Sequence, residues 1–295
     1  MTQVLIRPAR EADLEAMGAI TAASYHEVNA RTFQRSWPDP QLRAPTRNSA
    51  WIKRTRHTLT TDPEGCWVAE IDGAVVGGAI SRVRELMWTL SSFAVRPECQ
   101  GQGIGLQLLA AAMHHGRGCL RGMFAASADP GAVRRYRLAG FTLHPQMFLT
   151  GVVDRDAIPV VERVREGSAG DFDLLDSIDR QTRGAAHLSD HEVLLEDSRL
   201  IVCERNNAAA YAYVDDTGSP SLLAATSRRT ATDVMWEALA SSTPGETVAV
   251  HHITAVNEWA IDVGLAARMS VHQSGYLCLR GMRPPSPYLH HGSML

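Results

Sequence analysis

The stretch Gln100-Gly101-Gln102-Gly103-Ile104-Gly105 decides the fold of this chain. It follows an apolar, strand-like run, Leu90 to Val95, and precedes a helix-like run, Leu106 to His115. Three glycines that alternate within six residues bring no side chains to pack, so they offer bare backbone. A glycine-rich turn that opens a helix presents unpaired N–H groups together with the positive end of the helix dipole. The sequence therefore predicts a binding site for a phosphate or pyrophosphate group.

The spacing of the glycines distinguishes between the known phosphate loops. A dinucleotide-binding fingerprint, G-x-G-x-x-G, would need a glycine at Leu106 or Leu108. A Walker loop would need Gly-Lys-Ser/Thr, and the single lysine of the chain lies far upstream. The pattern that matches is Q/R-x-x-G-x-G/A, with Gln100, Gly103 and Gly105 at its named positions. This run resembles the pyrophosphate loop of the GNAT superfamily of acetyl-CoA-dependent N-acetyltransferases, which also has a strand before the loop and a helix after it.

A second motif carries the same resemblance. Asp129 can cap a helix that starts at Pro130, and Gly140 suits the left-handed end of that helix. Between them, Ala132 and Tyr136 lie one turn apart on one face. The stretch resembles the GNAT pattern N-x-x-A-x-x-x-Y-x-x-x-G-F, with Asp129 in place of the usual asparagine. That exchange keeps a cap but loses any hydrogen bond that the amide would donate to the cofactor.

The order of the elements expected in the first half agrees with this fold. We expect strands at 4–6, 66–71, 75–83, 87–95 and 120–126, helices at 14–24, 51–59, 106–115 and 130–139, and a mostly irregular segment at 26–45. Asp13 is expected to cap the first helix, and Asp72-Gly73 to form a hairpin turn. A further strand completes the order of the family, which extends to about Val153.

The second half resembles a degenerate copy of the first. Without a gap, the run Asn257 to Met269 aligns with Asp129 to Phe141 and places Gly264 at the position of Tyr136. Where a second pyrophosphate loop should be, the chain has Thr226-Ser227-Arg228-Arg229-Thr230-Ala231, which contains no glycine. We therefore expect a second domain that keeps the fold and has lost the chemistry, as in tandem members of the family.

These patterns predict a mixed α+β (α/β) protein of two tandem GNAT-like domains. Each would be a central, mostly antiparallel mixed sheet flanked by helices. A length of 295 residues is long for one such domain and suits two. The boundaries expected are a catalytic domain with the acetyl-CoA site at 1–153, a degenerate domain at 154–283, and an extended, proline-rich C-terminal tail at 284–295.

The resemblance implies which residues bind acetyl-CoA, the co-substrate. The strand before the loop would hold the pantetheine arm through its backbone, and one of its N–H groups would polarise the thioester carbonyl. Tyr136 would protonate the departing thiolate or hydrogen-bond it, although helix spacing alone also suits a packed aromatic ring. The expected cofactor contacts are Phe93, Ala94, Val95, Gln100, Gly101, Gln102, Gly103, Ile104, Gly105, Asp129 and Tyr136.

The base that would take the proton of the amine stays open. Many members of the family carry a glutamate on the strand before the loop, about where this chain has Ser91. The nearest alternatives in chain order are Glu85, His26 and Glu27, each of which also suits an ordinary surface or core position. A base acting through water could be any of them. The candidate catalytic set is therefore Tyr136, Ser91 and Glu85.

Composition limits the partners. A net charge of −3 argues against a surface for nucleic acid or anionic membrane. The five cysteines form no C-x-x-C pair, and the pairs His114-His115 and His251-His252 lack a third ligand, so no metal is expected. The first ten residues carry charges where a signal peptide needs an apolar core, and no apolar run approaches membrane-spanning length. We therefore expect a cytoplasmic protein.

The function expected is acetyl-CoA-dependent N-acetyl transfer to a primary amine of a small molecule, by direct attack on the thioester. The segment Asn29 to Asn48 and the second domain would shape the acceptor pocket, and homodimer formation is left open. One alternative is a non-catalytic acetyl-CoA-binding module, favoured by Ser91 and disfavoured by Tyr136. Another is an acyltransferase that uses an aminoacyl-tRNA or a carrier-protein thioester, disfavoured by the charge balance and the intact loop.

Overall fold

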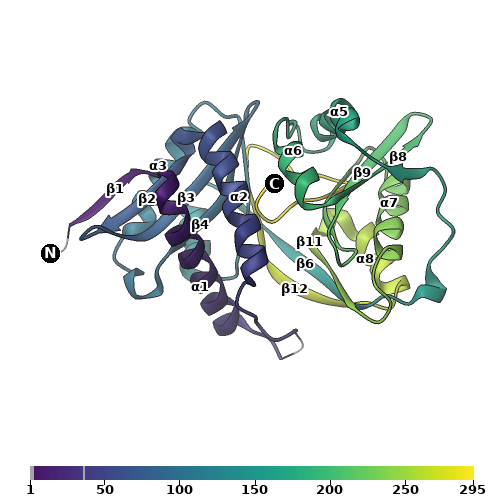
Figure 1. The fold of residues 1–295 in the computed structure, drawn as a ribbon, viewed down its shortest axis with the longest axis horizontal. Helices are drawn as coiled ribbons and strands as arrows, with labels where there is room; N and C mark the ends of the chain where they lie inside the picture. The colour runs from purple at the N-terminus through teal and green to yellow at the C-terminus, as the bar shows by residue number, and fades with distance from the viewer. Residues whose placement is uncertain (1–2, 36) are drawn as a thin grey trace. The chain divides into compact units, whose positions relative to one another are not determined.

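The computed structural model describes residues 3–35 and 37–295, and Met1, Thr2 and Ser36 lie outside the described residues. The chain divides into two compact units, Met1–Phe141 and Thr142–Leu295 (Figure 1). The division falls before strand β6 (Thr142–Val152), and not at residue 153 as the sequence suggested. The reason is that β6 pairs with β11 (Thr247–Thr254) and β12 (Ser270–Arg280) of the second unit.

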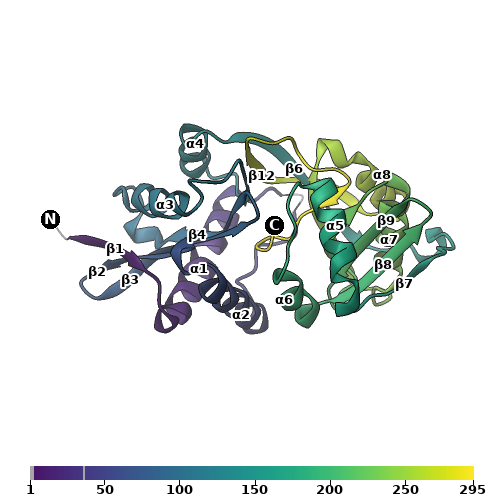
Figure 2. The ribbon, with the colours of Figure 1, turned by 90° about the horizontal axis from the view of Figure 1, so that it is seen from above.

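The first unit is a sheet with helices on both faces. Its elements are β1 (Val4–Pro8), α1 (Leu14–Thr32), α2 (Pro45–Thr61), β2 (Cys66–Ile71), β3 (Ala74–Arg84), β4 (Met87–Val95), α3 (Ile104–His115), β5 (Arg121–Ala126) and α4 (Pro130–Leu138). Neighbouring strands from β1 to β4 are antiparallel, and β4 and β5 are parallel. α1 and α2 cover one face, and α3 covers the other (Figure 2). The expected order of elements is confirmed, and no helix among the described residues is long and apolar enough to cross a bilayer.

Two local expectations for the first unit differ from the structure. The helix expected at 14–24 continues to Thr32 and the helix expected at 51–59 already begins at Pro45, so helices take up both ends of the segment at 26–45 that was expected to be mostly irregular. Residues 26–32 contain no proline or glycine that would end a helix, and proline is a preferred first residue of one. The carboxylate of Asp13 precedes α1 but does not cap it. It accepts hydrogen bonds from Arg7 (2.7 Å) and from the Arg10 backbone N–H (2.7 Å) instead.

The second unit repeats this order of elements. They are β7 (Val164–Glu166), α5 (Phe172–Thr182), α6 (Asp190–Asp197), β8 (Arg199–Arg205), β9 (Ala208–Val214), β10 (Pro220–Ala225), α7 (Arg228–Ala240), β11, α8 (Glu258–Ala266), β12 and β13 (Tyr288–Leu289). Strands β13, β10, β9, β8 and β7 form one antiparallel sheet in that order. The repeat inferred from a single helix motif therefore extends to a whole second fold.

The alternating side chains of β9 explain which helix covers each face of this sheet. Ala210 and Ala212 are buried in the apolar cluster that includes the inner side of α7. Tyr211 and Tyr213 point to the opposite face, because successive side chains of a strand alternate. There the Tyr211 hydroxyl donates to Asp179 of α5 over 2.6 Å. The sheet therefore lies between α7 on an apolar face and α5 on a face with buried polar groups.

The C-terminal residues are part of the core of the second unit, and not an extended tail. β13 pairs with β10, with Leu289 opposite Leu223 and Tyr288 opposite Ala224. Tyr288, Leu289, His290, Met294 and Leu295 are all buried. Composition misleads here, because Pro284, Pro285 and Pro287 break regular structure only briefly before the chain pairs with a strand.

His290, in this C-terminal segment, is held as a neutral imidazole. Its Nε2 accepts a hydrogen bond from the Gln146 side-chain amide (2.6 Å), and its Nδ1 donates to the His291 carbonyl (3.0 Å). One donor and one acceptor is the pattern of a neutral ring. The ring also stacks on half-buried His252 at 4.1 Å between centroids. Burial lowers the pKa of His290 from 6.5 to about 4, and it also lowers the pKa of His252.

We expect the protein to lose stability as the pH falls from 7 to 5. The unfolded chain binds a proton at His290 with a pKa near 6.5, whereas the folded protein binds it only near pH 4, so protonation favours unfolding between these values. This histidine should contribute a loss of about 2 kcal/mol at pH 5. Urea unfolding at both pH values measures it. His290→Gln should reduce the pH dependence, and the same exchange at exposed His114 should not; an unchanged pH dependence in His290→Gln would contradict the assignment.

Candidate active site

β4 and β5 separate along their length. They pair only over Met87–Thr89 of β4 and Arg121–Met123 of β5. Beyond Thr89, β4 continues to Val95 with β3 along one edge, so its other edge has no partner strand among the described residues of this unit. A free strand edge carries N–H and C=O groups that an added extended chain can pair with. The segment Phe93 to Val95, expected to bind the pantetheine arm, lies on this free edge.

A β-bulge in β4 sets the direction of the side chains beside this edge. The register with β3 shifts between Ile80 and Ser81, which leaves Ser91 as the extra residue. Trp88 and Phe93 lie an odd number of residues apart, yet both join one aromatic cluster through Phe124 and Tyr136. In a regular strand they would face opposite sides of the sheet. The bulge therefore turns Phe93 toward α4.

Tyr136 packs against the strand before the loop, through the ring of Phe93. It is on α4 with 6% of its surface exposed. Its ring centroid is 6.3 Å from that of Phe93 and 4.6 Å from that of Phe124. A Cβ on Gly105 would come within 3.3 Å of the Phe93 ring and 2.9 Å of Arg135 Nη1. The loop, the strand and α4 therefore meet at Phe93.

The glycine loop has the open backbone that a phosphate site requires. Gly101 and Gly103 are left-handed, with φ of 77° and 82°, and Gly103 is the residue before α3. A Cβ at either position would meet no described atom within 4 Å, so the space in front of the loop is empty of protein. The first N–H groups of α3 have no acceptor within the helix. The loop therefore has the backbone N–H donors and the open space that a bound pyrophosphate group would need.

Two polar residues of the motifs bind the protein itself. The Gln100 side chain donates to the Val95 carbonyl (3.0 Å), which ties the loop to the end of β4. Asp129 Oδ1 accepts from the Ala132 N–H (2.8 Å), so the predicted cap of α4 is confirmed. Its other oxygen forms an ion pair with Arg31 of α1. Cofactor contacts by these two residues stay predictions.

The base candidates fall into different parts of the first unit. Glu85 lies in the turn between β3 and β4, at the end of β4 remote from the loop. Eight residues of strand, about 26 Å, separate it from Phe93. The Ser91 hydroxyl accepts a hydrogen bond from Arg82 over 2.7 Å. His26 of α1 has a buried Nδ1 without a hydrogen-bond partner among the described residues. The structure therefore does not bring Glu85 and Tyr136 together.

Sequence reasoning missed a group of side chains on the α1 side of β4. The Phe93 N–H donates to the Tyr25 hydroxyl at a long 3.4 Å. The Arg43 guanidinium lies 5.8 Å from the Tyr25 ring centroid and 5.6 Å from that of Trp51. Arg43 has no carboxylate partner among the described residues, and burial lowers its pKa. The only sequence signal was that Arg43 belongs to the segment expected to shape the acceptor pocket.

The spacing of cysteines and histidines in the sequence also gave no sign of a buried cluster in the second unit. Asp179, His187 and His191 each offer a ligand atom, all within 4.8 Å of one another. His187 Nδ1 lies 2.6 Å from Asp179, and Arg183 Nη1 lies 2.9 Å from His187 Nε2. The guanidinium of Arg183 also binds the C-terminal Leu295, and its charge opposes a metal cation. We interpret the cluster as a polar network that holds the end of the chain.

Comparison with known proteins agrees with this geometry. Residues 22–141 match the sequence model of the acetyltransferase (GNAT) family. The first unit is a GNAT acetyltransferase domain. A stretch of 88 residues is 39% identical to the mycothiol acetyltransferase of Streptomyces bingchenggensis, but it spans only 28% of this chain and 29% of that protein.

Solved structures resemble the chain over both units. A Pyrococcus horikoshii protein is 20% identical, with 99% of this chain and 95% of that chain covered and a TM-score of 0.74. A GCN5-related N-acetyltransferase from Sphaerobacter thermophilus is 14% identical, with 94% and 95% covered and a TM-score of 0.59. At these identities the likeness shows the fold alone. It shows that the folds of both units occur together in single chains of other proteins.

We expect Gly103→Val to abolish measurable acetyl-CoA binding. The valine side chain would fill the empty space in front of the loop and would strain the left-handed backbone. Gly73→Val is a matched control, because Gly73 has a φ of 80° and equally open surroundings but lies in the β2–β3 turn. Calorimetric titration measures the affinities, and circular dichroism verifies folding. Equal affinity in folded Gly103→Val and Gly73→Val would contradict the loop assignment.

Proposed function

We propose that the first unit is an acetyl-CoA-dependent N-acetyltransferase that acts on a primary amine of a small molecule. The observation that carries the proposal is the free edge of β4 at Phe93, with the open glycine loop at one end and Tyr136 beside it. Membership of the first unit in an acetyltransferase family supports acetyl transfer in general. The amine class and the roles below are part of the proposal.

The loop and β4 would hold acetyl-CoA, which supplies the activated acetyl group. The N–H groups from Gly101 to Gly105 would bind the pyrophosphate at the start of α3. The free edge from Phe93 to Val95 would pair with the extended arm. The Phe93 N–H contacts Tyr25 only at 3.4 Å, beyond the usual hydrogen-bond range, so a thioester oxygen can replace that contact. In that position the N–H would stabilise negative charge on the oxygen.

Tyr136 would donate its proton to the departing thiolate. Its ring is fixed between Phe93 and Phe124, so the hydroxyl keeps one position relative to the strand that holds the thioester. A positioned acid that needs no rearrangement is more effective than water at this step. Packing between Phe93 and Phe124 accounts for the aromatic ring of Tyr136. The proposal gives the role of general acid to its hydroxyl group.

The amine would approach from the α1 side of β4. Tyr25 and Arg43 lie there, and the cation of Arg43 disfavours a second positive charge nearby. The amine would therefore bind more readily in its neutral, nucleophilic form. Of the base candidates, we favour His26 over Glu85, because His26 lies on α1, the helix that carries Tyr25, and has a buried ring nitrogen without a partner among the described residues.

The second unit lacks the features that carry the proposal. The edge of β10 that corresponds to the free edge of β4 is paired with β13. The Asn257 amide, which aligns with Asp129, donates to the Pro285 carbonyl and accepts from the Tyr288 N–H. A Cβ at Gly264, which aligns with Tyr136, would collide with the Leu149 side chain. The C-terminal segment therefore occupies the edge of β10 where a pantetheine arm would pair. Leu149 occupies the space that a side chain at the position of Gly264 would need.

The experiment that tests the function is a panel of small amines with acetyl-CoA and a thiol reagent that reports free CoA. Amine-dependent thiol release with a matching acetylated product would support the proposal. The alternative of a non-catalytic binding module is favoured by Ser91, which has no carboxylate and is held by Arg82. Tight acetyl-CoA binding without turnover on any amine would establish that alternative.

We expect Tyr136→Phe to lower kcat by about 100-fold, as for loss of one general acid, with little change in the KM for acetyl-CoA. The ring and its contacts with Phe93 and Phe124 are kept, so folding should be unaffected. Steady-state kinetics on an amine from the panel measures both constants. Tyr276→Phe, which removes a hydroxyl from β12, is the control. A wild-type kcat in Tyr136→Phe would leave Tyr136 a packing residue.

We also expect one acetyl-CoA to bind per chain. The only free strand edge beside a glycine loop that the described residues provide is in the first unit, because β13 takes the edge of β10. Calorimetric titration of the full chain gives the stoichiometry directly. Two equivalents per chain, or binding that survives Gly103→Val, would mean that the second unit also takes the cofactor.

A further inference from the structure

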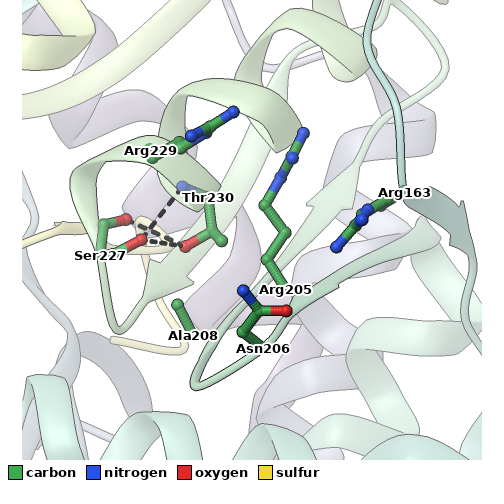
Figure 3. A pocket seen from close by; sticks show the side chains of 7 residues that line it. All are labelled: Arg163, Arg205, Asn206, Ala208, Ser227, Arg229 and Thr230. Carbon is green, nitrogen blue, oxygen red and sulfur yellow. Dashed lines mark hydrogen bonds between the residues drawn. The ribbon is translucent and has the colours of Figure 1, made fainter.

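A basic cavity lies in the second unit, and none of its lining residues belongs to the candidate active site. Its volume is about 380 Å³. Figure 3 shows arginines from separate segments around it, one before β7, one at the end of β8 and one in the first turn of α7. The lining residues are Arg163, Arg205, Asn206, Ala208, Ser227, Arg229 and Thr230.

The positive charge of this cavity is only partly compensated by the protein. Arg205 Nε lies 2.7 Å from Asp233, and its Nη2 donates to the Glu162 carbonyl over 3.2 Å. Arg163 and Arg229 have no carboxylate partner among the described residues. Cations that share one cavity repel one another, and an anion between them would remove that repulsion. Arg163 and Arg229 are exposed to solvent, so their positive charge is available to an anionic ligand that enters the cavity.

The start of α7 adds to the same field. Ser227 caps the helix by accepting a hydrogen bond from the Thr230 N–H over 3.2 Å. The N–H groups of Arg228 and Arg229 belong to the first turn and have no acceptor inside the helix. The dipole of this helix also places partial positive charge at its first turn. Side-chain and backbone donors are thus available to one ligand.

The size and charge of the cavity favour a compact ligand with more than one negative charge. Guanidinium groups pair with phosphate through parallel hydrogen bonds, and several of them suit a ligand with several oxygens. The volume lies at the lower end of the range for small-molecule sites. The cavity borders the β8–β9 turn, whereas the edge of β10 is covered by β13, so no pantetheine arm could pair with a strand there.

We propose that this cavity binds a compact phosphate-bearing anion of the size of inorganic pyrophosphate. Arg163 and Arg229 supply the free guanidinium groups, and Arg205, fixed by Asp233, forms the wall between them. The second unit would thereby have a binding function of its own in place of the acetyl-CoA site it lacks.

Calorimetric titration of the full chain with inorganic pyrophosphate tests the proposal. We expect saturable binding that weakens about 10-fold or more when Arg163→Gln and Arg229→Gln are combined. Arg228→Gln is the matched control, because Arg228 is exposed and adjacent but does not line the cavity. It should weaken binding less than about 3-fold, by loss of long-range charge alone. Should the double variant fail to fold, Arg229→Gln alone is compared with Arg228→Gln.

Two further titrations distinguish this site from other sources of binding. The same titration on Gly103→Val should retain the binding, because the loop of the first unit is not involved. Citrate should bind more weakly than pyrophosphate if the site recognises phosphate. Absence of binding at millimolar pyrophosphate, equal losses in the Arg228 and Arg229 variants, loss in Gly103→Val, or equally tight citrate binding would each overturn the proposal.

Discussion

The candidate active site depends on the separation of β4 from β5 after Thr89. Inside a sheet each backbone N–H and C=O has a partner, so a strand that loses its neighbour must find other partners for these groups. Between Leu90 and Val95 those partners are few, and the Phe93 N–H makes only a long contact with Tyr25. Three features lie beside this free edge: the bulge at Ser91, the packing of Phe93 on Gly105 and the ring of Tyr136.

In the second unit the corresponding strand edge is paired with a later segment of the same unit. β10 corresponds to β4, and β13 supplies the partner that β4 lacks. Asn257 fixes the approach to β13, and Arg183 binds the last residue in a buried network with His187 and Asp179. Closing the edge stabilises the fold and removes the place for an extended ligand. The closed edge of β10 and the buried C-terminal segment are thus two results of one pairing.

The sequence predicted those parts of the molecule whose conformation depends on residues a few positions apart. The left-handed glycines of the loop, the Asp129 cap and the order of elements follow from residues a few positions apart, and the structure has them. The bulge at Ser91 depends on how β3 and β4 align, which no spacing records. The network from Asp179 to Leu295 joins residues more than a hundred positions apart, and the proline content of the tail indicated the opposite of its burial.

The unpaired charge of Arg43 changes what the base has to do in the proposed reaction. A cation near an ammonium group lowers the pKa of that group, so a larger fraction of the bound amine is neutral and nucleophilic before any base acts. Ser91 has no charge with which to offset this effect, whereas a glutamate at that position would raise the pKa of the amine. A site with arginine beside Tyr25 and serine in the bulge therefore needs a base only after the bond to the acetyl carbon forms. Water or His26 is sufficient for that later step.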